Sequence, residues 1–234
     1  MRQKELVLGG VTPLSTIDFP GRLAAVFYTQ GCPLRCRYCH NPELWPAQAA
    51  PATLAWSAVM AWLHRRRGLL DAVVFSGGEP TAQGALGAAL AQVRDLGFET
   101  ALHTAGAYPK RLTEILPLLD WVGLDIKAPF DRYPELTGVP GSGEKAEQAL
   151  AAVLASGVDY ELRTTVHHQL LAPQDLMAVA HNLRSYGVRH WVLQEFRTQG
   201  CTDAALACTP SRLDPALVAR LRALVPDITV RAAA

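Results

Sequence analysis

The chain of 234 residues is 50% hydrophobic and 18% charged, a composition that is typical of a folded protein and excludes extensive disorder. Its 22 basic and 21 acidic side chains leave a formal net charge of +1, so overall charge does not indicate nucleic acid or an anionic membrane as a partner. The length allows one large domain or two small ones. Because no linker, repeat or shift in composition divides the sequence, we expect one domain over residues 1–234.

Short apolar runs alternate along the chain with longer segments of helical period. The predicted strands cover residues 23–29, 72–76, 98–103, 121–126, 160–166 and 190–195. The predicted helices cover residues 53–66, 85–96, 109–116, 144–155, 173–186 and 215–224. Glycines follow several of these helices, as is usual at a helix C-terminus. We predict no element after the last helix, and we expect residues 231–234 to form a frayed end.

This alternation predicts an α/β protein with a parallel sheet, because the strands are continuous apolar runs like those of buried parallel strands. Six strand–helix units are fewer than the eight of a closed TIM barrel. We therefore favour a partial, splayed (β/α)6 TIM-like barrel. A doubly wound open sheet is the alternative, and it is less favoured because the first turns after the strands lack a G-x-G-x-x-G motif.

No apolar run reaches the roughly 18 to 20 residues of a membrane span, and the N-terminal segment lacks the hydrophobic region of a signal peptide. We therefore expect a cytoplasmic protein with no membrane partner. Five cysteines are too few for a disulfide scaffold. In a reducing compartment, clustered thiols more often bind a metal or take part in chemistry.

Polar motifs stand where predicted strands end. In parallel α/β folds the active residues collect at the carboxyl ends of the strands, so these motifs are expected to share one rim. In chain order they are the cysteine cluster, SGGEP at 76–80, HTAG at 103–106, DIK at 125–127, residues 163–168 and residues 194–197.

Cys32, Cys36 and Cys39 have the spacing C-x3-C-x2-C on a loop directly after the first predicted strand. Three thiolates this close can converge on one inorganic centre. A structural zinc site has four ligands, whereas thiolates are the usual ligands of iron–sulfur clusters. A 4Fe-4S cluster held by three cysteines would leave one iron free to bind a small molecule.

Two simpler interpretations of the cysteines stay open. A structural zinc site could take His40 as its fourth ligand, although a residue adjacent to Cys39 would chelate with strain. Buried free thiols are less favoured, because Arg35 and Arg37 alternate with the cysteines and argue against a packed apolar site.

The cysteine spacing, with an aromatic Tyr38 before the third cysteine, resembles the signature of the radical S-adenosylmethionine (radical SAM) superfamily, and SGGEP resembles its methionine-binding motif. Residues 9–44 are similar to the start of glycyl-radical-enzyme activating proteins. Most similar are the activating proteins of anaerobic ribonucleoside-triphosphate reductases, a resemblance that continues through residues 123–129, 161–167 and 193–197.

This resemblance implies a radical SAM core with one 4Fe-4S cluster and S-adenosylmethionine as cofactors. The implied reaction is reductive cleavage of S-adenosylmethionine, which gives methionine and a 5′-deoxyadenosyl radical that removes a hydrogen atom from a glycine of the partner reductase. An external one-electron donor such as flavodoxin or ferredoxin is then required. Cys32, Cys36 and Cys39 would bind three irons and are the expected catalytic cysteines.

The methionine end of S-adenosylmethionine needs acceptors for its ammonium group and donors for its carboxylate. Gly77 and Gly78 would let backbone carbonyls approach the ammonium group, and Glu79 would add a negative charge. Lys127 is the candidate for the carboxylate, and Asp125 for holding Lys127 or a ribose hydroxyl. The alternatives are an ordinary glycine turn and a simple ion pair.

Three further residues are assigned by the same resemblance. Tyr38 is expected to bind the cofactor, and Asn41 would donate to the nucleoside or sulfonium region, although Asn-Pro is also an ordinary turn. Arg163 is the expected catalytic residue that meets the carboxylate or backbone of the substrate's glycine loop, and its alternative role is a surface salt bridge.

The sequence also departs from related activators. Pyruvate formate-lyase activators have an Asp-Thr pair near a cation site where this chain has His103 and Thr104, so we do not transfer that site. The ferredoxin-like insert of some activators is absent after Cys39, and we interpret Cys201 and Cys208 as free thiols.

Three alternatives to the reductase activase follow from the same features. The chain could activate another glycyl-radical enzyme such as pyruvate formate-lyase. It could act on a small molecule, as a deazaguanine-precursor synthase does, although the cysteine spacing of such enzymes is usually longer. It could also be a non-enzymatic metal-binding redox sensor, because three cysteines alone prove no turnover.

Overall fold

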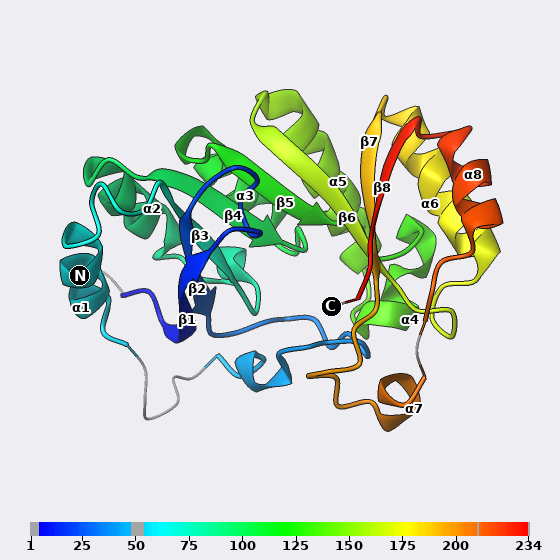
Figure 1. The fold of residues 1–234 in the computed structure, drawn as a ribbon, viewed down its shortest axis with the longest axis horizontal. Helices are drawn as coiled ribbons and strands as arrows, with labels where there is room; N and C mark the ends of the chain where they lie inside the picture. The colour runs from blue at the N-terminus through cyan, green and yellow to red at the C-terminus, as the bar shows by residue number, and fades with distance from the viewer. Residues whose placement is uncertain (1–4, 48–53, 210, 234) are drawn as a thin grey trace.

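A computed structural model describes residues 5–47, 54–209 and 211–233 (Figure 1). Eight strands form one curved sheet in which spatial order follows chain order from β1 to β8. The strands are β1 (Leu8–Ser15), β2 (Ala24–Thr29), β3 (Ala72–Gly77), β4 (Glu99–Thr104), β5 (Trp121–Asp125), β6 (Asp159–Val166), β7 (His190–Glu195) and β8 (Asp227–Arg231).

Strands β2 to β8 pair in parallel with their neighbours, and β1 pairs antiparallel with β2. The six predicted strands correspond to β2 to β7, so the prediction of an α/β fold with a mostly parallel, partial barrel-like sheet is confirmed. The two edge strands were not predicted. The β1 segment LGGVTPLS has two glycines and a proline, which weaken a strand signal.

The helices lie between successive strands in the chain; the longer ones cover the outer, convex face of the sheet, and a short one lies beyond the strand ends at the bottom of the view (Figure 1). They are α1 (Trp56–His64), α2 (Leu86–Asp95), α3 (Pro109–Ile115), α4 (Tyr133–Thr137), α5 (Ser142–Ser156), α6 (Pro173–Ser185), α7 (Ala204–Ala207) and α8 (Pro215–Arg222). The short α4 and α7 were not predicted. The predicted start of the first helix, Thr53, lies outside the described residues. None of the helices in the described ranges is long and apolar enough to cross a bilayer.

Alternate residues of each strand face two different cores. Phe27 and Phe75 point outward and pack with Leu90 and other helix residues in the larger core, where each fully buried large apolar side chain contributes about 1.5–3 kcal/mol. Val26, Val74 and Trp121 belong to a smaller inner core, where Phe19 stacks on Trp121 with ring centroids 5.7 Å apart. Phe19 therefore helps to close the barrel at the amino ends of its strands, and the carboxyl ends stay open.

Strand β8 corrects the expectation of a frayed end at residues 231–234. Arg231 is the last residue of β8, and its guanidinium binds both carboxylate oxygens of the buried Glu161 at 2.8 and 2.6 Å. This bidentate pair fixes the edge strand across β7 to the inner face of β6. A five-residue strand without a strongly apolar run gave no sequence signal, because its partner acid lies 70 residues away.

Candidate active site

The cysteine loop begins at the end of β2 and is fastened to the loop that follows β3. The amide of Gly78 donates to the carbonyl of Thr29, and the amide of Glu79 donates to the carbonyl of Gly31, each at 2.9 Å. The amide of Gly31 in turn donates to Leu44 O at 2.8 Å. These bonds close the base of the loop, so the thiols are presented from a fixed frame.

Both glycines of SGGEP are required by this close approach of two backbones. A Cβ on Gly77 would lie 2.4 Å from Thr29 N, and the backbone φ of Gly77 is +108°, which strongly favours glycine. A Cβ on Gly78 would lie 2.4 Å from Gly31 O and 3.0 Å from Leu44 O. The glycines therefore hold the cysteine loop in place, a packing role that their place in the motif did not reveal.

Cys32, Cys36 and Cys39 are free thiols that line one cavity of about 290 Å³. Cys36 is 8% exposed and packs against Leu34 and Ala107. Burial raises the pKa of Cys32 to about 12 and also raises the pKa of Cys36. These thiols therefore need a strongly cationic centre nearby to ionise, which is the situation of thiolates that bind a metal cluster.

The arginines between the cysteines are not part of the cavity lining. The guanidinium of Arg35 lies 5.3 Å from the ring centroid of Trp45, and Arg37 forms an ion pair with Asp203 at 2.9 Å. Both arginines are exposed. Their alternation with the cysteines thus reflects two faces of the loop.

His40, the proposed fourth zinc ligand, is engaged elsewhere. Its Nε2 atom lies 2.8 Å from the carbonyl of Arg197, and its ring stacks on Phe196 with centroids 5.3 Å apart. Within the described ranges, no group of three or more His, Cys, Asp or Glu side chains is arranged to hold a single metal ion. The contacts of His40 with Arg197 and Phe196 therefore do not favour this histidine as a fourth zinc ligand.

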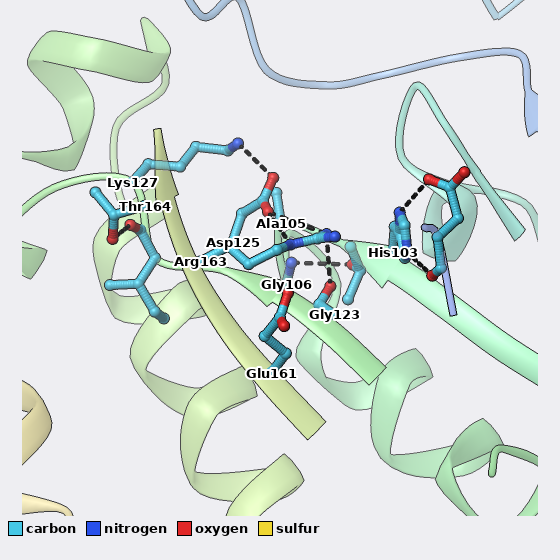
Figure 2. A network of polar contacts seen from close by, with 12 residues as sticks. His103, Ala105, Gly106, Gly123, Asp125, Lys127, Glu161, Arg163 and Thr164 are labelled. Atoms are coloured by element: carbon cyan, nitrogen blue, oxygen red, sulfur yellow. Dashed lines mark hydrogen bonds and ion pairs between the residues drawn. The ribbon is translucent and has the colours of Figure 1, made fainter. Parts of the chain in front are cut away.

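A charge network at the ends of β5 and β6 lines the same cavity as the cysteines (Figure 2). Asp125, at the end of β5, accepts from Lys127 Nζ at 3.1 Å through one carboxylate oxygen and from Arg163 Nε at 3.2 Å through the other. Lys127 Nζ also donates to the hydroxyl of Tyr38 at 3.3 Å. The structure therefore joins the third cysteine's neighbour, DIK and the β6 arginine in one cluster.

The charges in this network fix its protonation. Burial alone would raise the pKa of Asp125, but the Lys127 and Arg163 cations lower it below the ordinary value. Burial would lower the pKa of Lys127, but the Asp125 carboxylate raises it well above the ordinary value. Two cations thus share one carboxylate, and the net positive charge that remains suits an anionic ligand group.

Gly123 makes room for this network. A Cβ at this position would lie 2.8 Å from Arg163 Cζ, and the Gly123 carbonyl accepts from Arg163 Nη2 at 3.3 Å. The hydroxyl of Tyr133, at the start of α4, accepts from the amide of Lys127 at 2.8 Å. Sequence analysis missed both residues, because neither carries a chemical group that marks a site.

Glu79 lies behind the cavity wall. It is fully buried, and its Oε1 accepts from the amide of Thr81 at 3.1 Å and from the hydroxyls of Thr81 and Thr104, each at 2.7 Å. Its Oε2 accepts from the amide of Ala105 at 2.9 Å. The carboxylate therefore ties the loops after β3 and β4 together, where the sequence led us to expect a direct contact with the cofactor.

Every other residue that we predicted for the site lines the same cavity. Asn41 is among them, and its side chain makes no capping bond to the turn that it begins. The cavity also includes Ser76, Ala105, Thr165 and Gln194, which lie in the predicted strand-end motifs but were assigned no role. Sequence analysis did not single out Leu34 and Trp45, which also line the cavity.

His103 is held as a structural residue. Its Nε2 atom lies 2.7 Å from the carbonyl of Asp18, and its ring packs edge-on against Trp121. Burial, reinforced by the charge of Arg163, lowers the pKa of His103 from 6.5 to about 3. The imidazole is therefore neutral at physiological pH.

We expect this histidine to make the fold acid-sensitive. Below pH 6.5 the unfolded chain binds a proton at His103 that the folded chain refuses until about pH 3, so stability present above pH 6.5 falls as the pH falls. Between pH 7.5 and pH 5 the wild-type apo-protein should lose about 2 kcal/mol more unfolding free energy than His103→Gln. Urea denaturation of both proteins at the two pH values measures this difference, and equal losses would contradict it.

Comparison with known proteins supports the sequence resemblance. The model of the radical SAM superfamily matches residues 26–178. A candidate glycyl-radical enzyme activating enzyme of Methanocaldococcus jannaschii is 26% identical over 84% of this chain and 82% of its own length. The pyruvate formate-lyase-activating enzyme of Staphylococcus aureus is 32% identical over 58% of this chain and 59% of its own length.

Solved structures share the fold at low sequence identity. SuiB of Streptococcus suis, bound to S-adenosylmethionine, aligns with a TM-score of 0.63 and 14% identity over 89% of this chain and 49% of its own. QueE of Escherichia coli aligns with a TM-score of 0.56 and 17% identity over 97% of this chain and 94% of its own.

The radical SAM superfamily uses a 4Fe-4S cluster and S-adenosylmethionine, and the residues of the cavity fit both groups. Three free thiols, of which Cys32 and Cys36 have pKa values raised by burial, provide a ligand set for a cationic cluster. The excess positive charge of Lys127 and Arg163 over Asp125 suits the methionine carboxylate. The cavity thus provides a donor set for each cofactor.

Proposed function

The chain belongs to the radical SAM superfamily, and we propose that it is an activase that generates a glycyl radical on an anaerobic ribonucleoside-triphosphate reductase. The observation that carries this proposal is the convergence of three thiols and the Asp125 charge network on one open cavity. The similarity to relatives named as glycyl-radical-enzyme activators supports the choice of a protein substrate.

The chemistry supplied by the bound cluster and S-adenosylmethionine is one-electron reductive cleavage, which gives a 5′-deoxyadenosyl radical. Cys32, Cys36 and Cys39 would hold the cluster. Lys127 would bind the methionine carboxylate while Asp125 keeps the ammonium of Lys127 charged and oriented. The protein's contribution is thus to bind, orient and shield the reacting groups.

The remaining site residues are assigned to nearby groups of the cofactor or substrate. Tyr38 and Asn41 line the cavity beside the cysteines and would contact S-adenosylmethionine. Backbone carbonyls of Gly77 and Gly78 would meet the methionine ammonium group. Glu79 would act indirectly, because its carboxylate is occupied by protein donors. Arg163, fixed by Asp125, would meet the backbone or carboxylate of the substrate loop.

The chain is proposed to work as one cytoplasmic domain without a ferredoxin-like insert. Between Cys39 and α1 the sequence has no further cysteine, and Cys201 and Cys208 are free thiols. A flavodoxin or ferredoxin would therefore reduce the single cluster directly. We assign no nucleic-acid or membrane partner.

Pyruvate formate-lyase is the second candidate partner, favoured by the 32% identity to its Staphylococcus aureus activating enzyme. A small-molecule substrate is the remaining enzymatic alternative, and a non-enzymatic redox sensor is the last. An experiment with isotopically labelled candidate partners distinguishes the reductase, pyruvate formate-lyase, a small-molecule substrate and a redox sensor.

The decisive experiment places deuterium at the glycine α-carbons of each candidate partner and follows the label. We expect deuterium in 5′-deoxyadenosine and a glycyl doublet in the electron paramagnetic resonance spectrum of the reductase. Cleavage of S-adenosylmethionine should also speed up when the cognate partner is present. Label from a small molecule, with no doublet on either enzyme, would contradict the activase proposal and leave the superfamily assignment intact.

A further inference from the structure

A second ion pair lies on the inner face of the sheet, next to the Asp125 network. Leu162 of β6 belongs to the outer core, so its neighbours Glu161 and Arg163 both point into the barrel. Glu161 is 6% exposed, and its two carboxylate oxygens accept from Arg231 of β8 at 2.8 and 2.6 Å. A carboxylate in this position needs a cation, because an unpaired buried charge is strongly unfavourable.

Arg163 is a second cation within reach of Glu161. Side chains two residues apart on one face of a strand leave the backbone only about 6–7 Å apart, and the guanidinium of Arg163 lies over Gly123, the register partner of Glu161 on β5. Arg163 nevertheless donates to Asp125 at 3.2 Å and to the Gly123 carbonyl at 3.3 Å (Figure 2). Within the described residues no ion pair joins Arg163 to Glu161.

Arg231 accounts for this choice of partner. Its bidentate contact neutralises Glu161 and takes one site on each carboxylate oxygen. Its own charge also repels a second guanidinium from the same carboxylate. Besides burial, the charges of both Arg163 and Arg231 lower the pKa of His103, so the two cations occupy the same part of the barrel. With Arg231 in place, Glu161 competes only weakly for Arg163.

The partner of Arg163 sets the charge that the cavity presents to a ligand. Asp125, Lys127 and Arg163 are part of the cavity lining, and Glu161 lies deeper in the barrel. While Arg163 binds Asp125, two cations share one carboxylate and one positive charge is left over. If Arg163 moved to Glu161, Lys127 and Asp125 would remain as a neutral pair. The cavity would then lose the excess positive charge that suits a carboxylate ligand.

We propose that Arg231 is a positioning residue for the binding of S-adenosylmethionine. By neutralising Glu161 it keeps Arg163 bonded to Asp125, where the charge of Arg163 attracts the methionine carboxylate. This inference rests on the assignment of the Asp125 network to S-adenosylmethionine in the proposed function, and extends it to a residue of the edge strand. It does not depend on which partner enzyme is activated.

The test is a set of variants of the ion pair in anaerobically reconstituted protein, with the affinity for S-adenosylmethionine measured by calorimetry. Arg231→Gln should weaken binding about 10-fold, the loss of one charge-assisted contact, because Glu161 then captures Arg163. Glu161→Gln/Arg231→Gln should bind with near wild-type affinity, because no carboxylate remains to compete. The iron content should be normal in both. The matched control is Arg22→Gln, which breaks an exposed ion pair with Glu99 at the amino ends of the strands and should leave the affinity unchanged.

The position of Arg163 provides a measurement that needs no cofactor. In a crystal structure of the apo-protein with Arg231→Gln, the guanidinium of Arg163 should bind Glu161 and no longer Asp125. In the double variant it should bind Asp125, as in the wild type. Arg231→Lys keeps the positive charge and should retain most of the affinity.

A purely structural role of Arg231 predicts a different pattern. Both glutamine variants lack the bidentate pair that holds β8, so a double variant that binds as weakly as Arg231→Gln would overturn the inference, and so would wild-type affinity in Arg231→Gln. Lys127→Gln tests the underlying assignment and should also weaken binding about 10-fold. A loss in Lys127→Gln without one in Arg231→Gln contradicts the role of Arg231 alone. Wild-type affinity in Lys127→Gln shows that the Asp125 network does not bind S-adenosylmethionine, and the role of Arg231 fails with that assignment.

Discussion

Replacing Cys36 with alanine is expected to abolish the iron–sulfur cluster and with it the reductive cleavage of S-adenosylmethionine. Three thiols line the cavity, so loss of one leaves two ligands, which is too few to hold a 4Fe-4S cluster stably. Anaerobically reconstituted wild type should contain about four irons per chain, and the variant should fall to background. Iron analysis and the visible absorption of the cluster measure the effect.

The apo-protein of this variant should remain folded. Cys36 packs with Leu34 and Ala107 in a small cluster apart from the two main cores, so we expect a loss of about 1 kcal/mol in unfolding free energy. The matched control is Cys208→Ala, because Cys208 is an exposed free thiol and its loss should leave the iron content unchanged. Tightly bound zinc that survives Cys36→Ala would contradict a cluster held by these three cysteines.

The parts of the fold that sequence could predict are those with a local signal. Strands β2 to β7 are buried on both faces, so their apolar runs are continuous and their ends are marked by glycines or polar motifs. Strands β1 and β8 are edge strands with mixed exposure. They are stabilised by residues far away in the sequence, as Arg231 of β8 is by Glu161. Local sequence patterns cannot predict such long-range pairs.

In the candidate site, too, the sequence could predict the positions of the residues but not the directions of their side chains. The rule that functional residues gather at the carboxyl ends of parallel strands placed the cysteines, Asp125, Lys127 and Arg163 on one rim, and these residues do line one cavity. The rule could not give the direction of each side chain. Glu79 stands at the right level of the sheet, but its carboxylate turns to Thr81 and Thr104.

Gly78→Val is expected to impair binding of both the 4Fe-4S cluster and S-adenosylmethionine, because the valine side chain would clash with the backbone of the cysteine loop. Its Cβ would lie 2.4 Å from Gly31 O and 3.0 Å from Leu44 O. The amide of Gly31 donates to Leu44 O at 2.8 Å, so these two segments cannot move apart without opening the loop. Overpacking of this kind costs about 1–3 kcal/mol or more. Reconstituted iron should therefore fall severalfold, together with the affinity for S-adenosylmethionine measured by calorimetry.

This expectation differs from the one that the motif alone supports. If Gly78 served the methionine ammonium group only, the variant would keep its iron and lose affinity for S-adenosylmethionine alone. The matched control is Gly84→Val, because a Cβ on Gly84 meets no atom within 4 Å, and this variant should keep normal iron content and affinity. Normal iron in Gly78→Val would show that the cysteine loop tolerates the displacement and that the glycine is required by the cofactor itself. Loss of iron in Gly78→Val but not in Gly84→Val would show that SGGEP positions the cluster ligands through the backbone of Gly31.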